Sequence, residues 1–257
     1  MFTYAYGAVS DKGDIRTDNQ DSILYLTGSI QGSEAALSVI ADGMGGLSFG
    51  AQTSQYITEQ FKRWWYEEFP DIVRENMDHK EDIRELLEQE IWDINQAILA
   101  FNHQMQCKSG STLSLVLLYK NQYFIENVGD SRVYLLRGQS LYQLTEDHSL
   151  VARMMRHYQL SEEEAKRSVM KNKLTMCIGM FSAPESNYYE GELEEGDCFL
   201  LCSDGLYNTL KTSQIERILG EREFDAAEKA EYLRRMIEPG KASDNVSAIV
   251  VQITGEI

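Results

Sequence analysis

Two pairs of helix-like segments, each bracketed by short strand-like runs, limit the fold of this chain more than any other feature of its sequence. Two long helices are expected over Gly50–Phe69 and Lys80–Met105, where apolar residues recur at helical spacing. A second pair is expected over Thr212–Leu219 and Asp225–Ile237, and Pro239-Gly240 ends it. Strands on both sides of each pair favour an α+β sandwich, with antiparallel sheets inside and helices outside, over repeated βαβ units.

The expected strands are short, and hairpin-length turns separate several of them, which indicates antiparallel pairing. They are Thr3–Val9, Ser22–Thr27, Ala35–Ala41, Ser111–Tyr119, Tyr123–Val128, Arg132–Arg137, Ser140–Leu144, Tyr188–Leu193, Cys198–Ser203 and Val246–Ile253. Residues 147–180 are polar and basic, with helices expected over Ser149–Tyr158 and Ser161–Ser168, the second opening on a capping box at Ser161-Glu-Glu-Glu164. Because no linker or internal repeat divides the 257 residues, we expect one domain over residues 1–257.

Charge and cysteine usage narrow the class of protein. The chain has 24 Lys and Arg against 41 Asp and Glu, a net charge of −17, which argues against a nucleic-acid binder or a protein held on an anionic membrane. No apolar run approaches the ~20 residues of a membrane helix, and the N-terminus lacks a secretory signal. The four cysteines form no CxxC pair, and Cys198 and Cys202 are expected to face inward. We therefore expect a cytoplasmic protein with reduced thiols.

Five aspartates stand at the ends of expected strands. Asp42, Asp130 and Asp204 each follow an apolar run, whereas Asp21 and Asp244 each precede one. In antiparallel sheets the end of one strand and the start of its neighbour share an edge, so these five acids can converge there. Such a cluster would repel itself unless divalent cations relieved the charge, and ligation by oxygen alone selects Mg²⁺ or Mn²⁺ over zinc.

The same placement also fits ordinary turn chemistry, which stays open for each acid taken alone. It is weaker for Asp42 and Asp204, because Gly43 and Gly205 follow them, and a glycine lets the backbone turn sharply and its carbonyl approach a metal. The glycine-rich segment that begins at Gly43 lacks the Lys-Ser/Thr of a P-loop, and Ser48 replaces the third glycine of a Rossmann fingerprint. Both nucleotide-binding interpretations are therefore rejected.

Seven short motifs follow one another along nearly the whole chain. They are Gly13-x-x-Arg16-x-x-Asn19-Gln-Asp21, Asp42-Gly-Met-Gly-Gly46, Gly110-Ser-Thr112, Gly129-Asp-Ser-Arg132, Leu144-Thr-x-Asp-His-Ser149, Ser203-Asp-Gly205 and Asp244-Asn-Val246. In this order and spacing, the chain resembles the PP2C-like (PPM) metal-dependent serine/threonine protein phosphatases. Met44, where animal members have histidine, and the compact length resemble the bacterial branch.

The resemblance implies a four-layer α-β-β-α sandwich, with a flap subdomain over about residues 147–180 and a binuclear Mn²⁺ or Mg²⁺ centre at one end. By this resemblance Asp42 would bridge both ions, and the Gly43 carbonyl would bind one of them. Asp204 and Asp244 would bind the other ion, and Asp21 would support the ion on the Gly43 side.

The resemblance also implies the chemistry. Arg16 would hold the substrate phosphate, and Asp130 with Asp204 would form a third, weaker metal site. A hydroxide bridging the two ions would attack phosphorus in line, so no phospho-enzyme would form. The implied activity is hydrolysis of phosphoserine and phosphothreonine in phosphoproteins, with a Ser/Thr kinase as counterpart, and we expect a monomer.

Departures from the family pattern leave alternatives open. Met44 supplies no general acid, Gln20 replaces a glutamate of animal members, and Met176 stands where an arginine or lysine is common. Substrate preference is therefore expected to be atypical. A non-catalytic phosphopeptide-binding or regulatory pseudophosphatase and a phosphatase of small phosphate esters remain the alternatives.

Other candidate residues have plainer explanations. His148 fits a structural turn residue better than a catalytic acid, and His103 and Cys107, four residues apart on a helix, fit ordinary helix residues better than a zinc pair. A basic cluster in residues 166–173 could steer phosphorylated substrates or simply pair with the acids of residues 162–164. Its members are Lys166, Arg167, Lys171 and Lys173.

Overall fold

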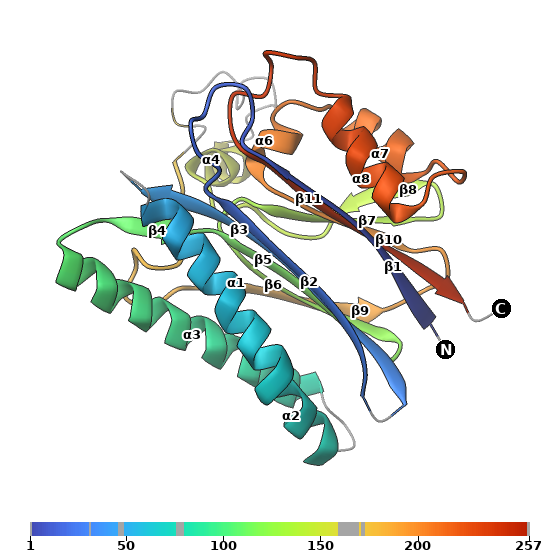
Figure 1. Cartoon of the computed structure of the whole chain (residues 1–257), viewed down its shortest axis with the longest axis horizontal. Coiled ribbons are helices and arrows are strands. Elements are labelled where there is room, and N and C mark those ends of the chain that lie inside the picture. The colour runs from blue at the N-terminus through green and yellow to red at the C-terminus, as the bar shows by residue number, and fades with distance from the viewer. Residues whose placement is uncertain are drawn as a thin grey trace.

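The computed structural model describes residues 2–30, 32–45, 49–75, 80–158, 170 and 173–255. Two antiparallel sheets lie face to face between two layers of helices (Figure 1). One sheet has the strand order β1-β11-β10-β7-β8, and the other has the order β2-β3-β5-β6-β9, with β4 paired to β3. Every strand pair is antiparallel. The expected α+β sandwich is therefore confirmed.

The strands lie close to their expected positions. The first sheet consists of β1 (Phe2–Asp11), β11 (Val246–Gly255), β10 (Cys198–Cys202), β7 (Arg132–Arg137) and β8 (Ser140–Gln143). The second consists of β2 (Asp21–Ile30), β3 (Ser33–Gly45), β4 (Ser109–Ser111), β5 (Leu113–Tyr119), β6 (Gln122–Val128) and β9 (Asn187–Glu192).

Helices cover the outer face of each sheet. The second sheet packs against α1 (Phe49–Glu67), α2 (Phe69–Glu75) and α3 (Lys80–Met105), and the first packs against α7 (Thr212–Leu219) and α8 (Ala226–Arg235). Two further helices, α4 (Leu150–Tyr158) and α6 (Asp204–Tyr207), lie at one end of the sandwich, opposite the end that holds both termini (Figure 1).

Three apolar cores join the four layers. Strand β3 shows why they form, because its side chains alternate between two of them: Ile40 faces the other sheet, whereas Leu37 and Val39 face the helices α1 and α3. Both faces are covered, so the strand is almost continuously apolar in sequence. Trp64 and Phe61 of α1 are fully buried in the outer core, and each such side chain contributes about 1.5–3 kcal/mol of burial free energy.

Residues 147–180 are described in part. Helix α4 confirms the helix expected over Ser149–Tyr158, whereas the expected helix over Ser161–Ser168 and its capping box lie outside the described residues. The segment after it returns to the sandwich through isolated bridges that pair Leu174 with Ser149 and Ile178 with Ser111. Both bridges therefore join residues 174–178 to other described parts of the chain.

Cysteine placement agrees with the sequence. Cys198 and Cys202 are fully buried on β10, as expected, and all four cysteines are free. None of the helices in the described residues combines the length and the apolar character needed to span a membrane.

Candidate metal centre

Strand register brings the first two acids together. In the β2–β3 ladder Asp21 lies directly opposite Asp42, so two carboxylates from different strands start on neighbouring backbone positions. The sequence placed Asp42 after its strand and Asp21 before its own, whereas Asp42 lies three residues before the end of β3 and Asp21 is the first residue of β2. Strand β3 continues through Gly45, because Gly43–Gly45 leave the main sheet and pair with β4 instead.

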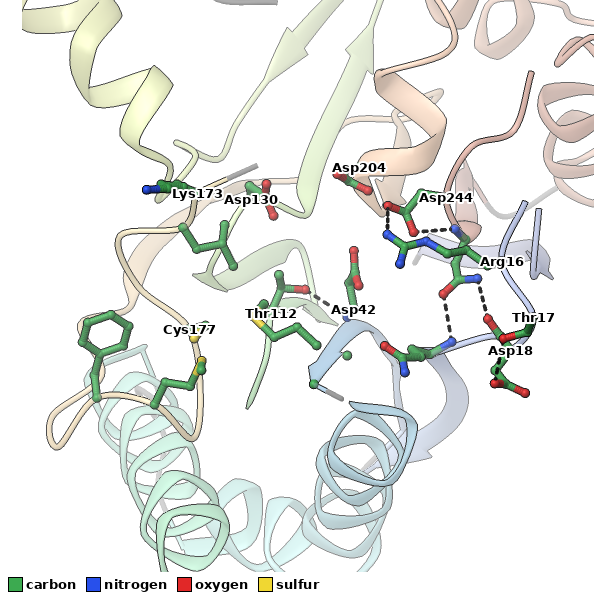
Figure 2. Close-up of a pocket in the computed structure, with 18 residues that line it drawn as sticks. Arg16, Thr17, Asp18, Asp42, Thr112, Asp130, Lys173, Cys177, Asp204 and Asp244 are labelled. Atoms are coloured by element: carbon green, nitrogen blue, oxygen red, sulfur yellow. Dashed lines mark hydrogen bonds and ion pairs between the residues drawn. The ribbon is translucent and has the colours of Figure 1, made fainter. Parts of the chain in front are cut away.

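The other three acids reach the same end from separate elements. Asp130 follows β6, Asp204 begins α6 directly after β10, and Asp244 lies two residues before β11. Strands β10 and β11 are antiparallel neighbours, so the end of one and the start of the other share an edge. Figure 2 shows the Asp42 carboxylate pointing into the space between Asp130, Asp204 and Asp244.

These four acids line a cavity of about 720 Å³, together with Arg16 and the Gly43 backbone. Asp21 is buried, with 8% of its surface exposed, and does not line the cavity, but it lies opposite Asp42 in the β2–β3 ladder. The structure therefore gathers all the acids that the sequence singled out, four around the cavity and Asp21 beside Asp42.

Hydrogen bonds hold the Asp42 backbone rigidly. The Asp42 amide donates to Thr112 Oγ1 at 3.0 Å, and the Thr112 amide donates to the Asp42 carbonyl at 2.9 Å. Ser111 Oγ also donates to that carbonyl, at 3.0 Å, and Ser131 Oγ lies 2.7 Å from Thr112 Oγ1. The sequence motif Gly110-Ser-Thr112 was the signal for this support, although the sequence alone gave it no role.

Asn245 anchors the loop that carries Arg16. Its Oδ1 accepts from the Gln20 amide at 2.9 Å, and its Nδ2 donates to the carbonyls of Lys12 and Asp18, both at 2.9 Å. One side chain thus ties both ends of the loop to the start of β11. Sequence reasoning treated Asn245 only as part of a motif and missed this function.

Gly43 and Gly205 are required for a reason other than the expected one. Neither has a positive φ, so the backbone conformation itself does not require glycine at either position. A Cβ on Gly43 would lie 2.2 Å from the Gly50 carbonyl oxygen, and one on Gly205 would lie 2.0 Å from the Asn245 carbonyl oxygen. At both positions two backbone segments pack so closely that no side chain fits between them. Glycine therefore allows β3 to approach α1 and α6 to approach the start of β11.

The cluster makes its own carboxylates hard to ionise. Burial first, and then the charge of Asp130, raises the pKa of Asp204 to about 8. Burial followed by the charge of Asp147 raises the pKa of Asp130 to about 7, and burial raises that of Asp21 to about 6. Burial and then Asp21 hold the pKa of Asp42 well above its usual range. Positive charge brought into the cavity would therefore be strongly favoured.

Arg16 is the cation that the structure places against the acids. Its Nη2 donates to Asp244 Oδ2 at 2.7 Å, while the Asn245 amide donates to Asp244 Oδ1 at 2.9 Å (Figure 2). Hydrogen bonding to Asp244 raises the pKa of the guanidinium, so it stays charged. The Arg16 side chain is 54% exposed, which leaves it free to reorient.

The donor set fits a hard divalent cation. Asp21 Oδ2 accepts from Ser203 Oγ at 2.8 Å, whereas its buried Oδ1 has no hydrogen-bond partner among the described residues. A buried carboxylate oxygen without a partner is costly unless a cation or water satisfies it. All donors are oxygens, which suits Mg²⁺ or Mn²⁺. As placed, no three His, Cys, Asp or Glu side chains of the described ranges already form a metal-binding group.

The remaining candidates fall outside this centre. The Gly129 amide donates to His148 Nδ1 at 3.2 Å and the His148 amide donates to the Gly129 carbonyl at 2.8 Å, which confirms a structural turn residue. Cys107 donates to Asn102 Oδ1 at 3.2 Å, as an ordinary helix-end residue would. Of the basic cluster, Lys173 lines the cavity, whereas Lys166, Arg167 and Lys171 lie outside the described residues.

A family model agrees with this geometry. The model described as "Protein phosphatase 2C" matches residues 16–248, which include all the acids above. The chain belongs to the protein phosphatase 2C family. Membership confirms the expected enzyme class, a phosphoprotein phosphatase that depends on divalent metal, and it disfavours the pseudophosphatase and small-ester alternatives.

Named relatives and solved structures agree with the family. The chain is 31% identical to protein phosphatase PhpP of Streptococcus pneumoniae, over 96% of this chain and 97% of the relative. It is also 31% identical to the serine/threonine phosphatase stp of Listeria welshimeri, over 95% and 93% of the two chains.

The solved structures extend the agreement to the fold. The Streptococcus agalactiae serine/threonine phosphatase superposes with a TM-score of 0.85 at 28% identity, covering 97% of this chain and 99% of the other. The catalytic domain of the phosphatase PstP, solved with two manganese ions, gives 0.82 at 27% identity over 99% and 100% of the chains. The expected α-β-β-α sandwich is therefore confirmed.

Proposed function

We propose that this chain hydrolyses phosphoserine and phosphothreonine in phosphoproteins, with Mn²⁺ or Mg²⁺ held by the acid cluster. One observation carries the proposal: four carboxylates from separate parts of the chain line one cavity, Asp21 lies opposite one of them in the β2–β3 ladder, and Arg16 donates a hydrogen bond to another. A substrate dianion cannot enter such a site unless cations neutralise it first.

The proposed ligands follow from their places around the cavity. Asp42 sits centrally, so it is assigned to bridge two ions, with the Gly43 carbonyl and Asp21 on one side and Asp204 and Asp244 on the other. Two divalent ions supply a water of low pKa and neutralise the phosphate. A third, weaker site is assigned to Asp130 with Asp204.

Arg16 is assigned to the phosphate. In the structure it donates to Asp244 Oδ2, one of the oxygens assigned to an ion. Since a planar guanidinium matches phosphate oxygens in two-pronged geometry, we infer that Arg16 exchanges Asp244 for the phosphate when substrate binds. Its Nη and Nε donors would then stabilise the equatorial oxygens as charge develops on them.

His148 is not assigned a proton-transfer role. Burial lowers the pKa of its imidazole, which keeps the ring neutral at neutral pH. Its Nδ1 is also engaged by the Gly129 amide. A neutral ring held by backbone is a poor general acid.

The wider setting follows from the chemistry. Phosphoserine and phosphothreonine are made by Ser/Thr kinases, so a kinase of that class must supply the substrate. Free cysteines suit the reducing cytoplasm, where we place the protein as a monomer of one domain.

Turnover with matched variants tests the proposal. Wild type should hydrolyse a phosphothreonine peptide and p-nitrophenyl phosphate with Mn²⁺ present and should stop when EDTA is added. Asp42→Asn should lower kcat/KM by at least about 10³-fold, since the central ligand loses its charge. The control Asp93→Asn, at an exposed acid on α3 outside the cavity, should retain full activity. Equal turnover by Asp42→Asn and wild type would refute the assignment.

A further inference from the structure

One wall of the cavity is apolar, although its floor is acidic. Leu174, Cys177, Met180 and Phe181 line it, on the side where Figure 2 shows Cys177 well away from Arg16. Met180 is 45% exposed and Phe181 is 37% exposed. We call Leu174, Met180 and Phe181 the apolar shelf. Large apolar side chains left open beside a site gain about 25 cal/mol for each Å² that a ligand covers.

Two asparagines of α3 hold the part of the apolar shelf that carries Met180 and Phe181. Asn95, with no exposed surface, accepts from the Gly179 amide at 2.7 Å and donates to the Phe181 carbonyl at 2.9 Å. Asn102 Nδ2 donates to the Gly179 carbonyl at 3.0 Å. A buried amide is costly unless all its groups are bonded, so these bonds fix the backbone of residues 179–181 strongly.

The shelf also packs on a motif that supports the metal centre. A Cβ on Gly110 would lie 2.9 Å from Met180 Cγ, so Met180 lies directly over this glycine. Ile178, two residues before Met180, pairs with Ser111. The Ser111 hydroxyl in turn donates to the Asp42 carbonyl. The shelf and the central acid are therefore parts of one connected frame, and their separation is fixed.

We propose that the apolar shelf binds an apolar side chain of the phosphopeptide near its phosphoresidue, and so selects substrates. This inference rests on the proposed function. An extended peptide advances about 3.3 Å per residue, so side chains one to three positions from the phosphoresidue reach the wall of the same cavity. The phosphoresidue itself offers only a short polar side chain, which leaves the shelf uncovered. Lys173 lines this side too, so an acidic neighbour is the rival outcome.

Peptide pairs test the shelf. Phosphothreonine peptides that differ only in carrying Leu, Ala or Asp at the positions flanking the phosphoresidue are compared by kcat/KM with Mn²⁺. We expect Leu to exceed Ala by about 10-fold, the usual discrimination of an apolar pocket. Phe181→Ala should bring the Leu/Ala ratio close to 1, while Phe181→Leu should retain most of it. Each value is divided by the same variant's kcat/KM for p-nitrophenyl phosphate, so that losses of folding or metal cancel.

A control and clear outcomes separate the two proposals. Tyr66→Ala truncates an exposed aromatic residue near the end of α1, outside the cavity, and should keep the wild-type ratio. Absence of Mn²⁺-dependent turnover of every substrate would refute the proposed function. Turnover with a Leu/Ala ratio of 1, a ratio that survives in Phe181→Ala, or a preference for Asp would refute the shelf alone.

Discussion

Two groups of acidic residues in this molecule differ in what neutralises their charge. Asp197, with 1% of its surface exposed, receives Arg137 Nε at 2.9 Å and Nη2 at 2.7 Å. Asp147 receives Arg132 in the same two-pronged way, also at 2.9 and 2.7 Å. Each of these carboxylates binds an arginine through both of its oxygens, which is how buried acids are usually paired.

The acids of the metal centre are not paired with arginines in this two-pronged way within the described residues. Among the described residues, Arg16 forms an ion pair with one of these five acids, Asp244. The fold therefore neutralises the carboxylates that it uses for structure and leaves unneutralised those that it presents to the cavity. Stability lost through this repulsion is the cost of a site that is ready for cations.

The largest expected effect is that of a substitution in the metal centre on the stability of the protein. Asp42→Asn removes a carboxyl whose ionisation burial and the neighbouring acids oppose, so metal-free protein should become more stable at neutral pH even as activity is lost. Thermal unfolding in EDTA should show a higher Tm than wild type. Addition of Mn²⁺ should raise the Tm of wild type much more than that of the variant, since binding to the folded state stabilises it by mass action.

A lower Tm for Asp42→Asn in EDTA would contradict this account. It would mean that Asp42 contributes more through structural contacts than it costs through charge.

The next largest effect is expected at a buried acid that is paired with an arginine. Arg137→Met leaves Asp197 buried without its two-pronged partner, and we expect a loss of roughly 3 kcal/mol in the free energy of unfolding. At this chain length that is a fall of about 10 °C in Tm. Per folded molecule, kcat should stay at the wild-type value, because Arg137 and Asp197 lie outside the cavity.

Arg235→Met serves as the control, since Arg235 pairs only with Glu231 on the exposed face of α8. It should change stability by less than about 0.5 kcal/mol. Equal losses in the two variants would show that the buried pair has no special weight.

The smallest effect is a pH dependence of stability, and it comes from a buried carboxyl that, among the described residues, neither lines the cavity nor pairs with an arginine. Glu126 on β6 is fully buried, and neither of its carboxylate oxygens has a hydrogen-bond partner in the described part of the chain. Burial raises its pKa to about 8, so it is largely protonated at neutral pH in the folded protein and ionised in the unfolded one. The folded state thus binds the extra proton, and stability must fall as the pH rises from about 4.5 to about 8.

Glu126→Gln cannot ionise, so it should remove this part of the pH dependence. The difference in unfolding free energy between Glu126→Gln and wild type should grow in favour of the variant by on the order of 2 kcal/mol between pH 5 and 8. Denaturant unfolding at several pH values measures it. A difference that stays flat over this range would show that Glu126 is ionised or solvated in the folded protein.

Much of the fold could be predicted because its signals are local. Helix α3 and helix α7 were placed to the residue, since an apolar stripe of helical period is visible within a single segment. The short helix α6 was missed, because four residues are too few to show a period. Strand β3 was ended too early, since its last residues pair with the distant β4 rather than with the main sheet.

The residues of the site could be predicted from the sequence, but their arrangement in space could not. The sequence by itself determined which acids stand at strand ends, which glycines follow them and which segments are helical, because residue type and period are properties of a few neighbouring positions. Only the tertiary structure decided that Asp21 lies opposite Asp42, that Gly43 is needed for a backbone contact with Gly50, and that Arg16 rests on Asp244. Those relations join residues far apart in the chain, and strand register and close packing are set only when the layers come together.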